Sequence, residues 1–392
     1  MGLGHRVPRG MASVSGTAGP DFSFTQFREN PSAFILHTEV GSDNSLRARK
    51  AQRTMKSTFS RIKLVLATLF ISQLELSAQA EVTSLRVARQ YGIGYLQIMV
   101  MEHERLVEKH ARAQGLGEVT VSWNTYADGA VANDGIISGN LDFVAGGLGS
   151  FVILWDRTRD SLGVKGVAAL DSMPMLLNTR NPSVKSIKDL TDQDRIAIAG
   201  VKISSQAVTL QLASAQAFGD ANWSKFDHLT VNMAHPTALQ ALLSSRSEIT
   251  AHFASPPFQY DELKHAGVRT VLNSYDVWDG PQTFILAWTT SKFRDQNPKV
   301  YAAFLAALVE ATDFINNNKS TAAAMYLEMT GEKSTSVEGL VRILADPQLR
   351  FTLTPENVLK FASFRAGTGV VKTKPDSWKD LFFRDIHYLP GS

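Results

Sequence analysis

The feature that most constrains the fold of this chain is a repeated alternation of strand-like and helix-like segments. Apolar side chains alternate over residues 85–90 and 119–123, as in strands, whereas over residues 95–110 they recur at helical spacing. A second set begins with a strand at residues 195–199 and a helix at residues 204–218. Strands that alternate with helices favour parallel βαβ units, so we predict an α/β fold.

The two sets follow the same order, which predicts two lobes of like topology. In each set a short helix and a polar turn lead to a buried strand, which ends near Ala145 in the first set and near Phe253 in the second. Two apolar strand-like segments, residues 173–179 and 283–290, are the candidates for the connections between the lobes.

These connections set the expected domain boundaries. Lobe 1 is expected to contain residues 81–177 and 284–392, and lobe 2 residues 178–283. From residue 298 onward the pattern is mostly helical, and we expect these helices to return and pack on lobe 1.

Residues 55–80 have the three parts of a secretory signal peptide. A basic segment, residues 55–63, precedes a short apolar run, residues 64–71, and an Ala-Gln-Ala cleavage pattern ends at Ala80. The apolar run is too short to span a bilayer, which takes about 20 residues. The alternative is a buried helix. We expect export to the periplasm and cleavage after Ala80.

Residues 1–54 differ from the rest of the chain, because they are rich in Gly, Ser and Arg and have no sustained apolar period. We expect them to be a non-native extension before a true start at Met55, or a disordered leader. Of the net charge of +3, residues 1–54 carry +3 and residues 55–80 carry +2, which leaves −2 on residues 81–392. The basic balance therefore gives no reason to expect a nucleic-acid partner.

The chain contains no cysteine, which excludes disulfides, thiolate nucleophiles and cysteine-ligated metal sites. The glycines at residues 146–149 lack the G-x-G-x-x-G spacing of a dinucleotide site, and no P-loop, G-x-S-x-G or H-E-x-x-H motif is present. We expect neither a cofactor nor a bound metal.

Four turns lie where a strand ends and a helix begins: residues 91–94, 146–150, 202–206 and 254–257. In open α/β sheets ligands bind beyond the carboxyl ends of the strands. A helix N-terminus offers free N–H groups and roughly half a positive charge. These turns therefore predict a cleft suited to an anion.

Several side chains near these turns have both a structural and a functional interpretation. Lys202 is either a solvated loop lysine or the counter-charge to an anionic ligand. Ser204 and Ser205 can cap a helix, contact a ligand, or divide the two roles between them. His252 lies on an apolar strand and is more often a core histidine than a ligand contact. Trp278 is a candidate aromatic lid, because its neighbours look loop-like.

The order and spacing of several segments resemble the solute-binding proteins of ABC importers of the nitrate/sulfonate/taurine type (NMT1-like). The segments are SGNLDF at residues 138–143, GGLGS at 146–150, SIKDL at 186–190, SSQ at 204–206 after Gly200, and WKDLFF at 378–383. None of these motifs is decisive alone, and together they cover the chain from about residue 85 to 388.

The resemblance implies a type II periplasmic-binding-protein fold whose two lobes close on a small solute. It further implies delivery to a membrane permease driven by a separate ATPase, and a monomeric protein. Ligands of the group are small oxoanions and organosulfonates, with some heteroaromatic pyrimidines. The ligand contacts it implies are Tyr91, Gly147, Ser150, Met173, Ser204, Ser205 and Ser255, to which the turn and side-chain arguments add Gly92, Lys202 and Trp278.

Other functions remain as alternatives to transport of an anion. The enzymes known on this fold depend on cysteine, which this chain lacks, so we expect no enzymatic activity. The alternative of a hydrolase or lyase that uses His252 with Asp276 is not expected, since no nucleophile–base–orienter set is visible. The same fold could instead serve a non-transport periplasmic sensor, or bind a pyrimidine-like or aromatic sulfonate ligand through stacking on Tyr91 or Trp278.

Overall fold

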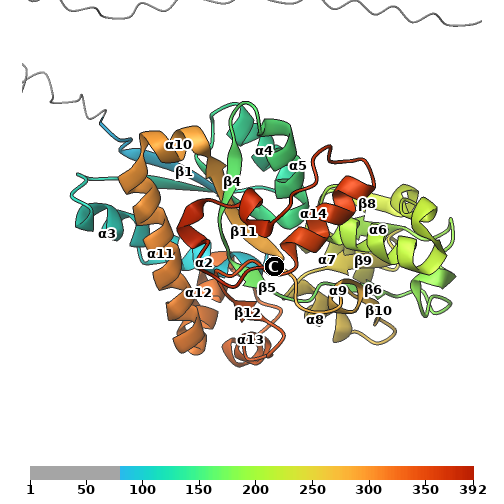
Figure 1. Ribbon diagram of the computed structural model, residues 1–392. Helices are drawn as coiled ribbons and strands as arrows, with labels where there is room; N and C mark the ends of the chain where they lie inside the picture. The colour runs from blue at the N-terminus through green and yellow to red at the C-terminus, as the bar shows by residue number, and fades with distance from the viewer. Residues whose placement is uncertain (1–79) are drawn as a thin grey trace, which may run out of the picture. The chain divides into compact units, whose positions relative to one another are not determined.

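Residues 80–392, which the computed structural model describes, fold around two five-stranded sheets that we call the sheets of lobe 1 and lobe 2 (Figure 1). The expected leader and nearly all of the expected signal peptide lie outside the described residues. Within residues 80–392 no helix has the length and apolarity needed to cross a membrane.

The lobe 1 sheet has the strand order β2-β1-β3-β11-β4. Its strands are β1 (Ser84–Arg89), β2 (Thr120–Thr125), β3 (Phe143–Gly147), β4 (Val164–Ala169) and β11 (Ile285–Thr290). Strand β1 runs parallel to β2 and β3, whereas β11 runs antiparallel to β3 and β4.

The lobe 2 sheet repeats this arrangement with the order β10-β6-β9-β7-β8. Its strands are β6 (Leu176–Thr179), β7 (Ile196–Ile198), β8 (Thr230–Asn232), β9 (Ala251–Ala254) and β10 (Arg269–Asn273). Strand β7 runs parallel to β8 and β9, whereas β6 runs antiparallel to β9 and β10. The α/β class is confirmed, and the antiparallel β6 and β11 are the strands that the chain forms just after it passes from one lobe to the other.

Helices cover both sheets. Those that follow lobe 1 strands are α2 (Leu96–His103), α3 (Leu106–Ala113), α4 (Gly129–Ile137), α5 (Leu148–Thr158), α10 (Ser291–Gln296), α11 (Pro298–Asn317), α12 (Lys319–Thr330) and α13 (Val337–Leu344). Those of lobe 2 are α6 (Ser205–Phe218), α7 (His235–Leu243), α8 (Phe258–Leu263) and α9 (Ser274–Trp278). The C-terminal segment adds α14 (Val358–Gly367) and α15 (Trp378–Leu381).

The helix expected over residues 95–110 is two helices. It breaks at Arg105, whose φ of 52° places the backbone in the left-handed region, between α2 and α3. Helix α2 is buried on nearly all sides, whereas α3 is amphipathic and packs on α11. The apolar period does not reveal this break, because both halves place apolar residues at helical spacing.

Two short segments connect the lobes and lie side by side. Leu170 N–H donates to the carbonyl of Ile285 at 2.9 Å, and Phe284 N–H donates to the carbonyl of Asp171 at 3.2 Å. The strand pair β5 (Asp171–Ser172) and β12 (Arg350–Phe351) adds a third segment beside them. The lobe 2 sheet begins at β6, whose first two residues fall inside the range expected for lobe 1. The first connection precedes the segment expected for it, residues 173–179, whereas the second, at Phe284, lies at the start of residues 283–290.

The C-terminal helices do not all pack on lobe 1, and this expectation is wrong for α14. Figure 1 shows α14 beside the lobe 2 helices, where the Phe361 ring stacks on Trp278 of α9 with centroids 5.0 Å apart. The chain then returns to lobe 1, where the Phe382 ring lies 5.9 Å from that of Phe151. An apolar helix face shows that a helix is buried, but not which partner buries it.

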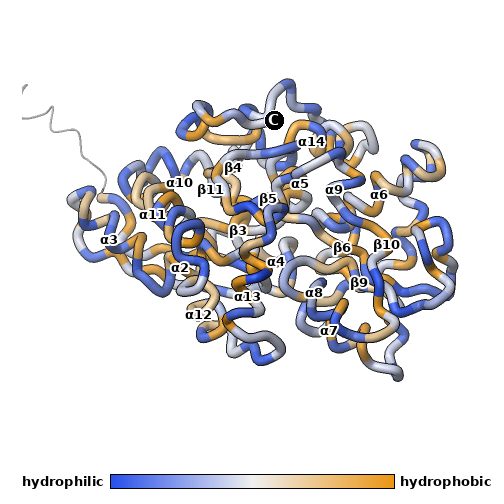
Figure 2. Tube along the Cα trace, turned by 90° about the horizontal axis from the view of Figure 1, so that it is seen from below, coloured by the Kyte–Doolittle hydropathy of each residue, from blue (hydrophilic) through white to orange (hydrophobic). Residues whose placement is uncertain are grey.

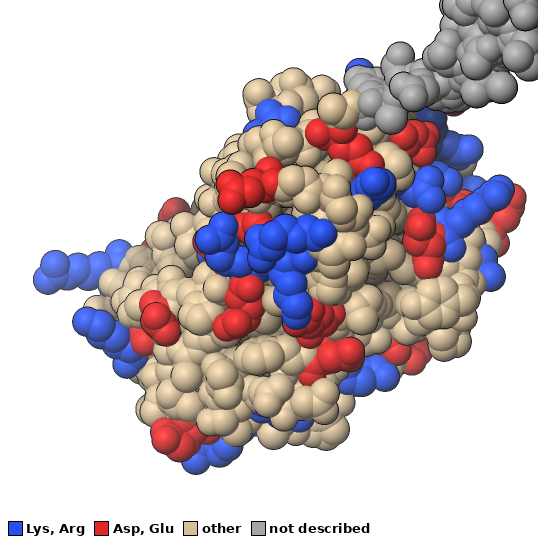
Figure 3. Space-filling model, turned by 90° about the vertical axis from the view of Figure 1, so that its left-hand side faces the viewer, with Lys and Arg blue, Asp and Glu red and all other residues tan. Residues whose placement is uncertain are grey.

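The hydrophobic residues gather inside both lobes, and hydrophilic ones prevail in the outer loops (Figure 2). Figure 3 shows Lys and Arg next to Asp and Glu on the face of lobe 1 that carries α3, α10 and α11. Lys109 pairs with Glu310 at 2.6 Å and Arg294 with Asp385 at 3.0 Å. The face therefore has mixed charge.

Asp171, in the first connection between the lobes, is a buried acid whose carboxyl group makes few hydrogen bonds. It is 0% exposed; Oδ1 accepts from the Ile285 N–H at 3.3 Å, and no group within residues 80–392 bonds Oδ2. Burial raises the pKa of Asp171 well above its usual value. The folded protein therefore holds this proton to a higher pH than the unfolded chain, which loses it near pH 4.

We expect Asp171→Asn to raise the free energy of unfolding at pH 7 by about 1.4 kcal/mol or more, the equivalent of one pKa unit, because asparagine takes up no proton when the chain folds. Because the pKa is raised in the folded state, the stability of the wild type falls as pH rises above about 4, and that of the variant does not. The gain should therefore shrink as the pH is lowered toward 4 in thermal melts. Asp276→Asn, at an exposed position, is the control; a gain that is equal at both pH values would contradict the assignment.

Candidate binding cleft

Four helix N-termini meet between the lobes, each at a helix that follows a parallel strand. Helices α4 and α5 follow β2 and β3 of lobe 1, and α6 and α7 follow β7 and β8 of lobe 2. The chain folds this way because helix-starting residues come directly after the strands: Asp128, Gly147 and Ser204 occupy N-cap positions, and Pro236 lies in the first turn of α7. The cleft predicted from the turns thus lies where the strand ends place it.

A small cavity lies at this meeting point, with a volume of ≈ 20 Å³, which is enough for about one water molecule. Its lining is polar but carries no Lys, Arg, Asp or Glu. The lining residues are Gln90, Tyr91, Tyr95, Gly129, Gly147, Ser150, Ala199, Ser204, Ser205, Gln206, His235 and Phe284. Hydroxyl, amide and imidazole groups therefore have to supply the polar contacts to anything bound there.

The lobes touch each other directly around the cavity. The Gly149 N–H donates to the Ser205 Oγ at 3.4 Å, and the Asn232 amide donates to the Asp128 carboxylate at 3.2 Å. On the other side, the Ile93 N–H donates to the carbonyl of Pro256 at 3.2 Å. These contacts close the cleft to a space much smaller than an organic solute.

Glycine is required at Gly92, where the chain turns toward lobe 2. Its φ of 116° is a conformation that residues with a Cβ rarely adopt, and a Cβ there would lie 3.0 Å from the carbonyl oxygen of Pro256. Ser255 lies in the same contact, 1% exposed, and its Oγ has no hydrogen-bond partner among the described residues. Both predicted residues thus lie at the lobe contact, beside the cavity lining.

Five of the predicted residues line the cavity. They are Tyr91, Gly147, Ser150, Ser204 and Ser205. The two serines make different contacts. The Ser204 Oγ accepts from the Ala207 N–H at 3.2 Å and caps α6, whereas the Ser205 Oγ accepts from Gly149 across the cleft.

Three predicted residues lie elsewhere. Met173 is buried in the core beside the first connection between the lobes, and it does not line the cavity. Trp278 is 1% exposed, stacks on Phe361 and donates its indole N–H to Thr209 at 2.9 Å. The lid prediction is wrong, because residues 274–278 form helix α9 and point the ring into the core.

Lys202 is the third of these residues. Its side chain is exposed and does not line the cavity, and its φ of 66° marks a tight turn before α6. The backbone carbonyl, not the ammonium, makes the contact here, since it accepts from Arg365 at 3.3 Å. The prediction that Lys202 faces the ligand is therefore not supported by its position.

We expect Lys202→Ala to change the affinity for a bound anion less than about threefold, as for an exposed, solvent-screened charge. Ser205→Ala, in the cavity lining, is the comparison and should weaken binding about tenfold, equal to about 1.4 kcal/mol. Titration calorimetry of both variants checks this. A tenfold loss of affinity in Lys202→Ala would show that the lysine contacts the bound anion after all.

Seven lining residues were missed from the sequence. They are Gln90, Tyr95, Gly129, Ala199, Gln206, His235 and Phe284. Gln206 is the last residue of the predicted turn 202–206, although it was not named as a contact, and Gln90 directly precedes the turn 91–94, so a window one residue wider would have included it. His235 begins α7 after β8, and the rule that selected the other helix starts could have found it. No local signal marks Phe284.

His235 belongs to a buried network behind the cavity. Its Nδ1 lies 2.8 Å from Nε2 of His252, and Nδ1 of His252 is bonded to a carboxylate oxygen of Glu262. The other Glu262 oxygen accepts from the Asn178 amide at 2.8 Å. The alternative that paired His252 with Asp276 is therefore wrong, since Asp276 is exposed on α9.

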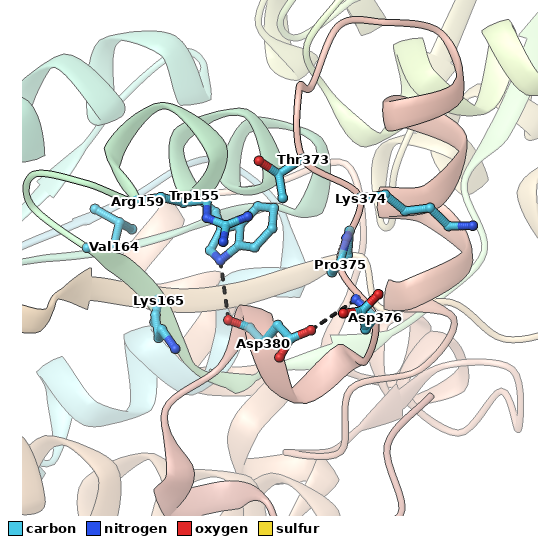
Figure 4. A pocket seen from close by; sticks show the side chains of 10 residues that line it. Trp155, Arg159, Val164, Lys165, Thr373, Lys374, Pro375, Asp376 and Asp380 are labelled. Atoms are coloured by element: carbon cyan, nitrogen blue, oxygen red, sulfur yellow. Dashed lines mark hydrogen bonds between the residues drawn. The ribbon is translucent and has the colours of Figure 1, made fainter. Parts of the chain in front are cut away.

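A larger surface pocket, ≈ 420 Å³, lies on lobe 1 between α5 and the segment before α15 (Figure 4). The Arg159 guanidinium lies 5.0 Å from the centre of the Trp155 ring, and the indole N–H donates to the carbonyl of Asp380 at 3.3 Å. Its lining includes no lobe 2 residue, so closure of the lobes does not change it. Among residues 80–392 no cluster of His, Asp and Glu could hold a metal ion.

Known proteins with this fold share the two-lobed arrangement. The alkanesulfonate-binding protein SsuA from Xanthomonas axonopodis pv. citri bound to MOPS matches with a TM-score of 0.60 and 15% identity, over 77% of this chain and 97% of that chain. The aliphatic sulphonate binding protein SsuA from Escherichia coli matches with a TM-score of 0.57 and 17% identity, over 78% and 93%.

The periplasmic nitrate-binding protein NrtA from Synechocystis PCC 6803 matches with a TM-score of 0.59 and 12% identity, over 76% of this chain and 84% of that chain. None of the curated protein sequences matches this chain. The sequence model of the NMT1-like family matches residues 78–328. With that match over most of its length and the two-lobed fold of periplasmic binding proteins, this chain belongs to the NMT1-like family.

Proposed function

We propose that this chain is the extracytoplasmic substrate-binding subunit of an ABC importer, which captures a small anionic solute of the sulfonate, taurine or nitrate kind and delivers it to a permease. The observation that carries the proposal is the cavity between the lobes, at which the N-termini of α4, α5, α6 and α7 meet. The likeness to sulfonate- and nitrate-binding proteins supports the same class of ligand. Export by the predicted signal peptide would bring the chain to the periplasm.

Neutral donors can hold an anion in such a cleft without a cationic side chain. Ser150 and Ser205 supply hydroxyl groups, Gln90 and Gln206 supply amide N–H groups, and the helix N-termini supply backbone N–H groups and a favourable potential. Hydrogen bonds to an ionised acceptor are roughly twice as strong as those between neutral groups. The lining therefore suits a small anion.

Binding has to separate the lobes first, because the ≈ 20 Å³ cavity holds a water molecule but no sulfonate. The solute would enter while the lobes are apart, and the lobes would then close on it through contacts such as the one between Gly149 and Ser205. The two connections between the lobes, around Asp171 and Phe284, are where a hinge motion would be absorbed. The permease would then distinguish the solute-loaded from the empty arrangement.

A heteroaromatic, pyrimidine-like ligand is the second candidate. Four aromatic side chains line the cavity: Tyr91, Tyr95, His235 and Phe284. Ring stacking contributes about 0.5–1.5 kcal/mol beyond the burial of apolar area. A ligand that combines a ring with an acidic group would use both sets of residues.

A thermal-shift screen of the purified protein tests the proposal with ethanesulfonate, taurine, nitrate, sulfate and 4-aminopyrimidine. A solute present at 100 times its Kd adds about 2.7 kcal/mol to the free energy of unfolding. A shift with the sulfonates or nitrate that is reduced in Ser205→Ala and kept in Lys202→Ala would support an anion in the cleft. A shift with the pyrimidine alone would favour the second candidate, and no shift with any of the five would contradict both.

A further inference from the structure

The network behind the cavity is a continuous hydrogen-bonded relay from a buried carboxylate to the ligand space. Glu262 and His252 are both 0% exposed, and His235 is 6% exposed and lines the cavity. The links run from Glu262 to His252, from His252 to His235 at 2.8 Å, and from Nε2 of His235 to the amide of Gln206 at 3.2 Å. A hydrogen-bond network that only stabilised the core would not need to extend to a residue that lines the ligand cavity.

The carboxylate determines the direction of the hydrogen bonds. An ionised Glu262 only accepts, so Nδ1 of His252 must carry a hydrogen. If His252 is neutral, its Nε2 accepts from the Nδ1–H of His235, and Nε2 of His235 accepts from the Gln206 amide N–H at the cavity. If the relay holds one more proton, His252 donates at both nitrogens and Nε2 of His235 becomes a donor. It then no longer accepts from the Gln206 amide and needs an acceptor in the cavity instead. A single proton thus reverses what His235 offers to a ligand.

The elements packed around His235 offer no other group that could take up the additional proton. Among the elements packed on α7, β7 has no titratable side chain and β9 contributes His252. Helix α8 contributes Glu262, together with Asp261 and Tyr260, which bond Lys264 and Asp346 respectively. Helix α6, which supplies Gln206, has no titratable group.

The phenols of Tyr91 and Tyr95 share the cavity lining with His235, and burial together with the nearby Asp171 raises the pKa of Tyr95 well above its usual value. His235 is therefore the lining residue whose protonation a bound anion can change near neutral pH.

We propose that an anionic solute binds in the cleft together with one proton from solvent, which the Glu262–His252–His235 relay takes up so that Nε2 of His235 donates a hydrogen bond to the solute's anionic group. This inference rests on the function proposed above. No cationic side chain lines the cavity, so an anion enclosed there gains from a proton that arrives with it. The proton forms one N–H bond in the relay, and no group leaves.

The empty protein is prepared for this uptake. Burial, with His252 beside it, lowers the pKa of His235 well below its usual value, so His235 itself is short of a proton in the empty protein. An enclosed anion favours the protonated form and raises the same pKa. Affinity should therefore rise as pH falls, by up to about tenfold per pH unit when one proton is taken up.

Calorimetric titration with ethanesulfonate tests this between pH 5.5 and 8.5, in buffers of different ionisation enthalpy. The expected result is an uptake approaching one proton per solute, together with affinity that falls as pH rises. His235→Gln keeps an amide at the cavity but does not titrate, and it should bind more weakly with a flat pH profile. His228→Gln is the matched control, because His228 is exposed, pairs with Asp192 and lies outside the cavity lining; it should keep the wild-type profile.

Glu262→Gln tests the positioning role, since it leaves His235 at the cavity and removes the carboxylate that stabilises the protonated relay. It should lose affinity and most of the pH dependence. NMR of histidine ring carbons in the wild type provides a measurement that does not depend on folded variants. Addition of ethanesulfonate at pH 7.5 should convert one of the two buried histidines to the imidazolium signature.

The outcomes separate the two proposals. Binding of ethanesulfonate without proton uptake, with a flat pH profile, would overturn the relay inference and leave the anion-binding function standing. A pH dependence that persists in His235→Gln would also overturn it. Absence of binding for every sulfonate and for nitrate across the whole pH range would overturn both.

Discussion

Replacing Gly149 with alanine is expected to weaken solute binding by about 100-fold, equal to about 2.7 kcal/mol, without lowering the stability of the fold. Gly149 lies in the first turn of α5, on the face that meets lobe 2. A Cβ at this position would overlap the carbonyl oxygen of Ile203 and lie 2.8 Å from the carbonyl carbon of Ser204. Both are backbone atoms of the opposite lobe, so α6 would have to move away and the lobes could not close.

The same substitution favours the helix itself, because glycine is about 1 kcal/mol less favourable than alanine inside a helix. Affinity and stability should therefore change in opposite directions. Titration calorimetry measures the first and thermal melting the second, while small-angle X-ray scattering with and without solute reports whether the lobes close. A variant that closes and binds like the wild type would show that this contact is not part of the bound state.

Gly367→Ala is the matched control for Gly149→Ala. Gly367 ends α14, and a Cβ there would have no atom within 4 Å among its surroundings. The change from glycine to alanine has a similar effect on helix propensity at both positions, but only Gly149 faces the other lobe. The control should therefore bind normally, and any shared loss of affinity would point to a general effect of the substitution.

The second large effect is expected from Phe361→Ala, which should lower the free energy of unfolding by about 3–5 kcal/mol, as for other buried aromatic residues. Phe361 is 0% exposed in α14 and stacks on Trp278 of α9, the contact by which the C-terminal segment packs on lobe 2. Its truncation leaves a cavity beside the indole. Urea denaturation, followed by Trp fluorescence, measures the loss.

Phe364→Ala is the control for this prediction, since it removes the same ring from the same helix. Phe364 is half-buried and meets Trp278 edge-on at 6.3 Å. A partly exposed ring that lacks the stacked contact should cost about 1–2 kcal/mol. If both variants lost the same free energy, the stacked contact of Phe361 would not be what secures α14.

The buried Arg365 explains why α14 is also connected to the cleft. Its guanidinium donates to the Gln211 side chain at 2.7 Å and to the carbonyl of Lys202 at 3.3 Å, in the turn that leads into α6. Burial lowers the pKa of Arg365 to about 10. A helix near the C-terminus therefore supports the turn before Ser204, more than 150 residues away along the chain.

The pattern of apolar residues was enough to predict the α/β class, and the turns between strands and helices were enough to predict where the cavity lies, while the family resemblance singled out five residues that line it. Both signals are local. A strand end followed by Gly147 or Ser204 has the same meaning in any open α/β sheet, because the carboxyl ends of parallel strands lie at one edge. The capping role of Ser204 could be predicted for the same reason.

Only the tertiary structure decided which partner each side chain meets. Trp278 and Lys202 were expected at the ligand, yet the first faces the core and the second faces solvent, because α9 and the turn before α6 orient them so. Helix α14 packs on lobe 2 through contacts with residues far away in the sequence. The pairing of His252 with Glu262 and His235 likewise joins side chains from three different elements. Local periodicity determines that a residue is buried; which atoms bury it depends on how the two sheets and their helices pack in three dimensions.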